Sequence, residues 1–343
     1  MVSFSGFVKR AFLGTLIMAV VFSVGVLFSG HLSQMRQRVS FRNIGVQTVH
    51  TTKYYLTTTQ TPVGRKSLPE CPETPPNINE PVKLNLTNIT LDELRKKYPS
   101  QSGDIYRPKG CRSRVRLAVV IPYRDREQHL GILLNNLIPF LKKQQADFTI
   151  FVAEQTPGGI FNRGLMINAG VAAALKADNF TCIVIHDVDL IPETSNNYYR
   201  CRENPLHLST ASAKYGYKLP YPSYAGGNIA ISPSQFKRIN GFSNWYFGWG
   251  GEDDDFEIRV KTVGMRLKRN PPRQGRYYAI KHERDKLNPE NPKKFLLFKS
   301  IRRRMKTEGL SSLHSNTTVS HQGTITWLTV AIDKQYYNST MKY

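Results

Sequence analysis

A loop of aromatic, glycine and acidic residues carries the most distinctive chemistry of this chain. Residues 242–256 read FSNWYFGWGGEDDDF, so four consecutive carboxylates, Glu252 to Asp255, follow a glycine-rich turn. Adjacent carboxylates repel one another, so we expect them on a solvated face or where a cation, a sugar hydroxyl or a transferred proton compensates them. The flat indole of Trp249 suits the C–H face of a sugar ring. Sharp backbone bends beside it are possible at Gly248, Gly250 and Gly251. The combination indicates a carbohydrate site.

A second acidic pair follows a buried-type strand. Residues Cys182 to His186 (CIVIH) run into Asp187, Val188 and Asp189. If the strand geometry persists, the two aspartates point to the same side at the carboxyl end of the strand, where open α/β sheets bind their ligands. Two carboxylates there can hold a divalent cation, which can neutralise the diphosphate of a nucleotide-sugar leaving group. The alternative is a turn or helix-capping pair.

Two loops combine aromatic and cationic side chains. Pro122 to Arg126 (PYRDR) follow the first predicted strand, and Arg124 and Arg126 can contact phosphates or a nucleobase while Tyr123 packs beside it. Phe161 to Arg163 (FNR) offer the same mixture ahead of a predicted helix. A solvated basic turn is the alternative for both loops.

Three further features are candidates for the same site. The small residues after Tyr224 (YAGG) allow a sugar or a backbone to approach closely, or they form a strand bend. A lone histidine is more often structural than a ligand, but Asp189 gives His282 a possible metal-binding partner. The basic run Arg302 to Arg304 is expected to be solvated and able to meet an acidic acceptor.

Alternating strands and helices must position these residues. β-branched runs predict strands at 116–122, 148–153 and 182–186, and apolar residues at helical spacing predict helices at 130–141 and 165–175. This order predicts an α/β domain with a mostly parallel central sheet flanked by helices. The proline-rich stretch before it, from Cys71 to Arg107, is expected to be irregular, with a short helix at 91–98 behind Thr90 as its cap.

Composition allows one large domain or two small ones and excludes disorder throughout. The 343 residues are 40% hydrophobic and 21% charged, with a net charge of +23. The charge favours anionic partners such as phosphates, acidic glycans or membrane surfaces. Nucleic acid is not expected as a partner, because other features place the chain outside the cytosol and nucleus.

An uncharged stretch near the N-terminus predicts a membrane anchor. Residues 11–30 carry no charge and have the length of a membrane span, with a cleavable signal peptide as the alternative. The short preceding segment, 1–10, is expected to be a cytoplasmic tail, which gives an N-in, C-out orientation. Residues 31–70 are predicted to form a stem, and 71–343 a lumenal domain.

Glycosylation signals and cysteines agree with a lumenal domain. Asn-x-Ser/Thr triplets begin at Asn85, Asn88, Asn179, Asn316 and Asn338, all on the C-terminal side of the predicted span. The four cysteines can form two disulfides in an oxidising lumen, and the residues alone permit three pairings: they are Cys71, Cys111, Cys182 and Cys201.

Taken in order, PYRDR, FNR, HDVDLIP, YAGG, GWGGEDDD and a later histidine resemble the β-1,4-galactosyltransferase family of Golgi type II membrane proteins. The resemblance runs from about Cys71 to Asp333. It implies a glycosyltransferase-A type fold, Mn²⁺ as cofactor, UDP-galactose as donor, a glycan acceptor and inversion at the anomeric carbon. It also implies that Cys71 pairs with Cys111, and Cys182 with Cys201.

The resemblance also assigns roles residue by residue. Asp189 and His282 would bind the metal, and Asp253 would be the base, with Glu252 and Asp254 holding the acceptor or donor sugar. The nucleotide-sugar site would comprise Pro122, Tyr123, Arg124, Arg126, Phe161, Arg163, Asp187, Val188, Tyr224 and Trp249. The acceptor site would comprise Trp249, Gly250, Gly251, Glu252, Asp253 and Asp254.

Two departures from the family pattern leave alternatives open. Many members place a methionine ligand three residues before the histidine, where this chain has Ala279, which cannot coordinate a metal. The motifs also resemble both the N-acetylglucosamine-acceptor branch and the xylose-acceptor branch. Tyr224 matches the position where family members that use galactose carry a tyrosine and those that use N-acetylgalactosamine carry a smaller aliphatic residue. The resemblance therefore implies that steric exclusion of the acetamido group favours galactose as donor. The alternatives are an N-acetylgalactosaminyltransferase, a xylose-acceptor galactosyltransferase, or a catalytically silent carbohydrate-binding protein.

Overall fold

The computed structural model describes residues 68–80, 82–99, 104–283, 288–323 and 325–342. The predicted tail, membrane span and stem up to residue 67 lie outside these residues. Within the described ranges, no helix combines the length and the apolar character that crossing a bilayer requires.

The described residues alternate helices and strands in the order that the sequence predicts for its central part, with ends shifted by a few residues. The helices are α2 Leu91–Lys97, α3 Glu127–Lys143, α4 Arg163–Ala177, α5 Pro233–Arg238, α6 Glu252–Thr262, α7 Lys294–Phe298, α8 Ile301–Arg304 and α9 Lys334–Lys342, with 3-10 turns η1 Ala213–Tyr215 and η2 Leu310–Ser312. The strands are β1 Arg116–Tyr123, β2 Asp147–Gln155, β3 Cys182–Ile185, β4 Leu190–Pro192, β5 Leu206–His207, β6 Ala211–Ser212, β7 Ile229–Ile231, β8 Lys268–Arg269, β9 Arg276–Ala279, β10 Ser315–His321 and β11 Thr326–Ile332.

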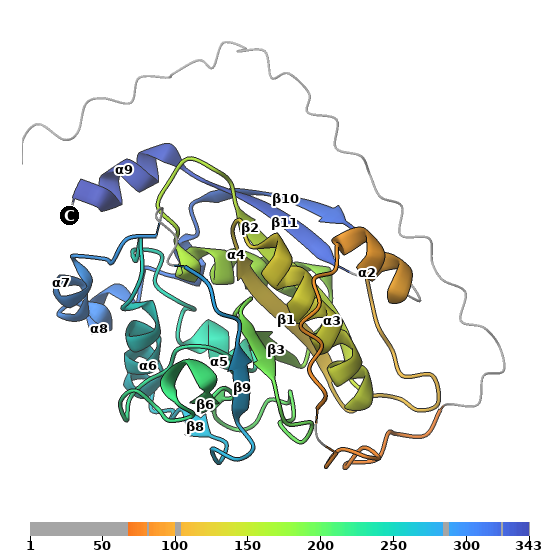
Figure 1. Ribbon diagram of the computed structural model, residues 1–343. Helices are drawn as coiled ribbons and strands as arrows, with labels where there is room; N and C mark the ends of the chain where they lie inside the picture. Colours follow the sequence, from red (N-terminus) through yellow and green to blue (C-terminus); the bar gives the residue numbers. More distant parts are fainter. Residues whose placement is uncertain (1–67, 81, 100–103, 284–287, 324, 343) are drawn as a thin grey trace, which may run out of the picture. The chain divides into compact units, whose positions relative to one another are not determined.

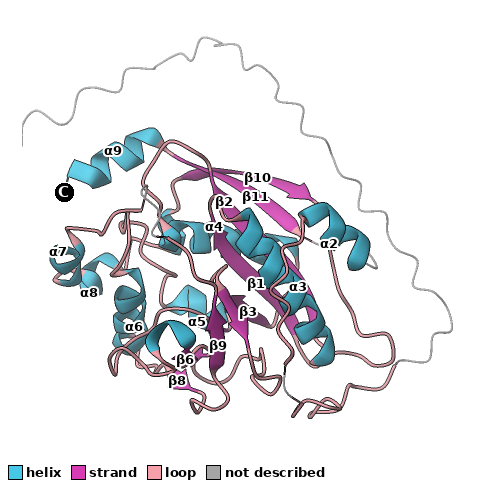
Figure 2. Ribbon diagram, viewed as in Figure 1, coloured by secondary structure: helices cyan, strands magenta, loops and turns pink. Residues whose placement is uncertain are grey.

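The main sheet is mixed rather than mostly parallel. Its strand order is β10-β11-β2-β1-β3-β7-β5-β8, with helices around it (Figure 2). β11, β2, β1 and β3 run parallel, whereas β10 is antiparallel to β11, and β7 is antiparallel to β3 and β5. The prediction of a mostly parallel sheet is wrong at these flanks. Two strands that are neighbours in a sheet and consecutive in the chain can run parallel only if a crossover segment, usually a helix, connects them. β10 and β11 are consecutive strands, and no described α-helix lies between β3 and β7.

The central strand β1 has a separate apolar core on each of its faces. Leu117, Val119 and Ile121 pack into a cluster with the apolar side of α3, and all three are fully buried. Ala118 and Val120 point the other way, into a cluster with α4, α5 and α6. This alternation is the two-residue period of a strand that is covered on both sides. Figure 1 shows α3 and α4 beside β1.

A small second sheet of β4, β9 and β6 brings distant residues of the chain together. β4 lies antiparallel to β9, with Leu190 opposite Ala279. The Ile280 amide extends this pairing by donating to the Asp189 carbonyl at 2.8 Å. Asp189 precedes β4 and His282 follows β9, so the register of these two strands places the predicted metal ligands next to each other.

Two disulfides form in the pairing that the family resemblance implies. Cys71 bonds Cys111, which ties the first described residues to the segment before β1. Cys182, at the start of β3, bonds Cys201. No free cysteine remains.

A buried cluster of four charges joins α6 to α8. Asp255, the last residue of the acidic run, has no exposed surface and contacts Arg259 at 2.5 Å and Arg304 at 2.9 Å. Glu308 contacts the same two guanidinium groups at 2.7 Å and 2.8 Å. The expectation that Arg302 to Arg304 is solvated is therefore wrong for Arg304, which is 6% exposed. Opposite charges alternate around the cluster, so each buried charge is compensated.

We predict that Asp255→Asn lowers the free energy of unfolding by about 3–5 kcal/mol, because it leaves two buried guanidinium groups with one carboxylate between them. Urea denaturation of the purified chain measures the change. Asp254→Asn, next to it on the same helix but partly exposed, serves as the matched control and is expected to cost less than about 1 kcal/mol. Equal losses in the two variants would show that the cluster has no special stabilising role.

Candidate active site

A cleft of about 810 Å³ lies where β1 and β3 end. Its lining includes residues from every motif that the sequence singles out, although these motifs span residues 122–282 of the chain. The predicted site residues that line it are Pro122, Arg124, Arg126, Phe161, Arg163, Asp187, Val188, Asp189, Tyr224, Trp249, Gly250, Gly251, Glu252, Asp253, Asp254 and His282. A cleft of this size with several converging charged groups is the usual form of a small-molecule site.

Tyr123 is the one predicted nucleotide-site residue that is set back from the cleft. Its side chain is 5% exposed, and its ring lies edge-on to Trp327 at 5.3 Å. Its hydroxyl accepts a hydrogen bond from the Arg126 amide at 3.2 Å. The Tyr123 side chain therefore supports the basic loop from behind, and a contact of this residue with the nucleotide stays a prediction.

Asp189 and His282 form the core of a potential metal site. The Oδ2 atom of Asp189 lies 3.2 Å from Nε2 of His282. Burial acts to raise the pKa of Asp189, but the hydrogen bond and charge of His282 outweigh it, so the pKa is lowered. The same hydrogen bond raises the pKa of His282. A carboxylate oxygen and an imidazole nitrogen fit Mn²⁺ as donors.

Among the described residues, Asp189 and His282 are the two side-chain donors that this arrangement brings together. Among the described residues, no three His, Cys, Asp or Glu side chains are grouped closely enough to hold a metal ion. Ala279 lies opposite Leu190 in the β4–β9 pair and adds no donor atom. The remaining positions around an ion would therefore be filled by water or by oxygens of a bound ligand.

His129 is a neighbour of this pair that sequence reasoning missed. Its ring stands edge-on to that of His282, with centroids 5.5 Å apart, and it also lines the cleft. Its Nε2 atom is buried and has no hydrogen-bond partner. Burial lowers its pKa, and the charges of Arg126 and His282 lower it further. Its position in the first turn of α3, directly after PYRDR, is the signal that places it at this edge of the sheet.

Arg163 links the two acidic segments. Its guanidinium contacts Asp187 at 2.6 Å and Glu252 at 3.6 Å. Burial alone would lower the pKa of Arg163, but the charges of Asp187 and Glu252 raise it, so the group stays cationic. Asp187 and Asp189 both line the cleft, as expected, although β3 ends at Ile185 and the two side chains have different partners. Asp187 turns to Arg163 and Asp189 to His282.

The acidic loop forms the first turn of a helix. Gly251 precedes α6 with a φ of 100°, which a residue with a side chain rarely adopts. Burial, with the charge of Asp253 adding to it, raises the pKa of Glu252 to about 7. Burial and the charge of Asp254 raise the pKa of Asp253 to about 6. A carboxylate with a pKa near the working pH is suited to accept a proton.

The YAGG loop meets the acidic loop at Gly226. A Cβ atom on Gly226 would lie 2.3 Å from the Tyr224 hydroxyl and 2.7 Å from Oδ2 of Asp253. A side chain at position 226 would therefore force Tyr224 or Asp253 to shift. Tyr224 is held by edge-on contacts with Tyr215 at 5.6 Å and Tyr221 at 5.4 Å. The Tyr221 hydroxyl in turn donates to Asp254 at 2.9 Å.

Several other lining residues were not identified from the sequence. Some lie close to recognised motifs; Tyr221, for example, is three residues before Tyr224. Others belong to α7, which reads KFLLF. Besides His129 they include Lys214, Tyr215, Tyr221, Ile258, Asn288, Lys294, Phe295 and Phe298. Trp249 is 48% exposed at the same mouth, as expected for a surface against which a sugar packs.

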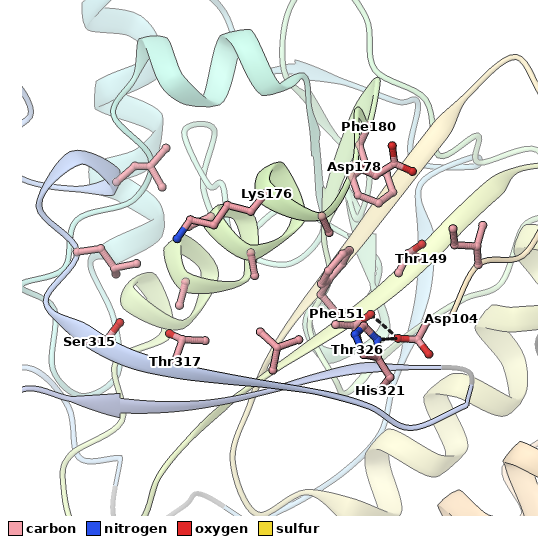
Figure 3. Close-up of a pocket in the computed structure, with 18 of the residues that line it drawn as sticks. Asp104, Thr149, Phe151, Lys176, Asp178, Phe180, Ser315, Thr317, His321 and Thr326 are labelled. Carbon is pink, nitrogen blue, oxygen red and sulfur yellow. Dashed lines mark hydrogen bonds and ion pairs between the residues drawn. The ribbon is translucent and has the colours of Figure 1, made fainter. Parts of the chain in front are cut away.

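A larger cavity of about 980 Å³ lies between α4 and the strands β10 and β11 (Figure 3). Three polar side chains in its lining contact one another. Asp104 contacts His321 at 2.5 Å and accepts a hydrogen bond from Thr326 at 2.7 Å. None of the predicted motif residues lines it. The smaller cleft, where acids, cations and aromatic rings converge, is therefore the candidate active site.

Comparisons with known proteins agree with this arrangement. Residues 71–202 match the N-terminal region of glycosyl transferase group 7, and residues 206–283 match a model described as the N-terminal domain of galactosyltransferase. Rat β-1,4-galactosyltransferase 4 is 44% identical over 249 residues, which are 72% of each chain. Rat β-1,4-galactosyltransferase 3 is 43% identical over 249 residues, which are 72% of this chain and 63% of the relative. The chain thus spans a little under two thirds of the length of some curated relatives.

A solved structure extends the match to the fold. A Drosophila β-1,4-galactosyltransferase 7 mutant in complex with manganese, UDP-Gal and xylobiose superposes with a TM-score of 0.56 at 28% identity, covering 66% of this chain and 98% of that one. The fold is that of a glycosyltransferase of the A type. The chain belongs to the β-1,4-galactosyltransferase family.

Proposed function

We propose that this protein transfers galactose from UDP-galactose, in β-1,4 linkage and with inversion, to a terminal N-acetylglucosamine or related sugar of a glycan. The observation that carries the proposal is that one cleft holds the Asp189–His282 pair and the carboxylate of Asp253, with Arg163 linking the two sides. Family membership and the galactosyltransferase names of the relatives support the choice of reaction.

Residues on the two sides of the cleft have different roles in the proposed reaction. Arg124 and Arg126 bind and orient the diphosphate and nucleotide of the donor, and Trp249 covers the sugar. Asp189 and His282 would hold Mn²⁺, which when bound neutralises charge on the leaving diphosphate. Asp253 accepts the proton of the attacking acceptor hydroxyl. A base facing the side opposite the leaving group suits a single displacement, which inverts the anomeric carbon.

Two enzymatic alternatives concern the sugars. An N-acetylgalactosamine donor is disfavoured by Tyr224, whose ring is held by Tyr215 and Tyr221 and cannot easily turn aside. A xylose acceptor has some support, since the related Drosophila structure contains xylobiose. We favour N-acetylglucosamine because the four cysteines, which form the bonds Cys71–Cys111 and Cys182–Cys201, resemble those of the N-acetylglucosamine-acceptor branch.

We further propose that the protein is a single-pass type II protein of the Golgi membrane with its catalytic domain in the lumen. The uncharged segment 11–30, the two disulfides and the five sequons support this location. The sequon asparagines are all exposed, so each is accessible for glycosylation: Asn85, Asn88, Asn179, Asn316 and Asn338.

A transfer assay with the purified full chain tests the reaction. UDP-galactose and an N-acetylglucosamine acceptor are expected to give product with Mn²⁺ and none after treatment with a chelator, because the diphosphate charge is then uncompensated. Xylose acceptors and UDP-N-acetylgalactosamine form the comparison panel. If no donor gives a metal-dependent product, the chain is instead a silent carbohydrate-binding protein, in which Ala279 has weakened the metal site.

Asp253→Asn is expected to lower turnover by about 10²–10⁴-fold while UDP-galactose still binds, because the amide cannot accept the proton. The native enzyme should lose activity as the pH falls through about 6, because protonation removes the base. Initial rates across pH and calorimetric titration of the donor measure both effects. Asp254→Asn, as the matched control, should weaken acceptor binding but keep turnover. A fully active Asp253→Asn variant would remove this residue as the base.

Tyr224→Leu is expected to admit UDP-N-acetylgalactosamine, because the smaller side chain leaves room for the acetamido group. The ratio of kcat/KM for the two donors should shift toward N-acetylgalactosamine by about 10–200-fold. Tyr224→Phe keeps the ring and should keep the galactose preference. An unchanged donor ratio in Tyr224→Leu would count against the steric argument.

A further inference from the structure

A fully buried histidine lies directly before the turn formed by Asp187 to Leu190, but it does not line the cleft. His186 follows β3 and has no exposed surface. Its Nδ1 atom lies 2.9 Å from the Asp187 carbonyl oxygen. A carbonyl oxygen can only accept a hydrogen bond, so Nδ1 carries the proton and donates it. Burial lowers the pKa of His186 to about 4, so the ring is neutral and its Nε2 atom is an acceptor.

Two donors meet the Nε2 atom of His186 and fix the orientation of the ring. The Tyr199 hydroxyl lies 2.8 Å from it, and Nδ2 of Asn228 lies 3.1 Å from it. Because the Tyr199 hydroxyl donates to the imidazole, it accepts in turn from the Tyr277 hydroxyl, 2.9 Å away. Nδ2 of Asn197 donates to the Tyr277 hydroxyl at 3.2 Å. All four of these partners are fully buried, and the donors in this chain of bonds all point towards His186.

Asn228 holds the other peptide group of Asp187. Its Oδ1 atom accepts a hydrogen bond from the Asp187 amide at 2.8 Å, while its Nδ2 atom donates to His186. Asn228 is itself fixed, because its own amide donates to the Ser209 hydroxyl at 2.7 Å and its carbonyl accepts from the Leu208 amide at 2.8 Å. Buried side chains therefore hold both the amide and the carbonyl of Asp187.

The carbonyl that His186 holds also begins the turn that carries Asp189. The Leu190 amide donates to the Asp187 carbonyl at 3.4 Å, which closes a four-residue turn with Asp189 as its third residue. From this turn the Asp189 carboxylate reaches His282, 3.2 Å away. A rotation of the Asp187 peptide group would therefore displace that carboxylate, because only one residue of the turn lies between them.

Buried hydrogen bonds of this kind can serve stability alone, but their arrangement here has a more specific consequence. The donors converge on one peptide group, two residues before a predicted metal ligand. Tyr277 lies on β9, the strand that leads to His282, so the same network reaches the segment that carries the other ligand. One set of buried bonds thus contacts both segments that supply the predicted donors.

We propose that His186 and Asn228 are positioning residues for a divalent cation: by holding both peptide groups of Asp187, they set the place of the Asp189 carboxylate relative to His282. This inference rests on the proposed function, in which Asp189 and His282 bind Mn²⁺. Neither His186 nor Asn228 lines the cleft, so neither is expected to contact the ion or the sugars. Residues that orient the ligands of a metal typically contribute about 10–100-fold to its affinity.

A Mn²⁺ titration of the purified full chain, followed by the electron paramagnetic resonance signal of free Mn²⁺, tests the proposal. Asn228→Ala and His186→Leu should each weaken Mn²⁺ binding by about 10–100-fold. His186→Asn places an amide nitrogen near the position of Nδ1, which can still donate to the Asp187 carbonyl, so we expect it to retain most of the affinity. In the transfer assay, Asn228→Ala should need more Mn²⁺ for its half-maximal rate but approach the native kcat at saturating Mn²⁺.

Asn168→Ala separates this effect from a general loss of stability. Asn168 is also fully buried, and its amide nitrogen donates to the Phe242 carbonyl at 2.8 Å and to Oδ1 of Asn244 at 2.7 Å. These partners belong to the segment 242–244 and not to the turn that carries Asp189. Asn168→Ala should therefore lower the melting temperature about as much as Asn228→Ala but leave the Mn²⁺ affinity unchanged. Tyr199→Phe removes only one hydroxyl donor and should weaken Mn²⁺ binding by less than about tenfold.

The outcomes distinguish this inference from the proposed function. Native Mn²⁺ affinity in folded Asn228→Ala and His186→Leu variants overturns the positioning role, whereas metal-dependent galactose transfer by the native chain would still support the reaction. An equal loss of affinity in Asn168→Ala also overturns it, because a general loosening of the fold would then explain the result. If the two larger changes prevent folding, an unchanged Mn²⁺ affinity in Tyr199→Phe overturns the role. If the native chain binds no Mn²⁺, both the positioning role and the Mn²⁺ site are wrong.

Discussion

The candidate site depends on one partly buried cation, Arg163. The Arg163 guanidinium lies between Asp187, after β3, and Glu252, at the start of α6, and so holds together two segments that would otherwise repel. The positive charge there lowers the pKa values of Glu252 and Asp253 and so opposes the effect of burial on them. Arg163 also opens α4, which packs on β1 and β2, so the link reaches into the core.

A second set of charges supports α6 from behind. The acidic run divides by position on the helix: Glu252, Asp253 and Asp254 face the cleft, whereas Asp255 points inward to Arg259 and Arg304. The same helix thus presents reactive carboxylates on one side and is fixed by a compensated carboxylate on the other. This division explains how four adjacent acids fit in one helical turn.

Sequence reasoning located the site well where a motif follows a strand. The loops after β1 and β3 could be placed because carboxyl ends of parallel strands share an edge. Prediction from the sequence failed where the position of a side chain depends on tertiary contacts. The inward turn of Asp255 and Arg304 requires the α6–α8 packing, and the setting of Tyr123 behind the loop requires Trp327, which is distant in sequence. His129 was missed because a single histidine in a helix has no pattern of its own. The antiparallel flanks were missed because no described helix lies between β10 and β11, and no described α-helix lies between β3 and β7.

The β4–β9 pair has a further consequence for the whole molecule. Asp189 and His282 are 93 residues apart and become neighbours only when the small sheet forms in its native register. In an unfolded chain these two donors are far apart, so a divalent ion that needs both of them would favour the native state. The supply of that ion in a compartment would then govern how long the protein survives there, as well as how fast it works.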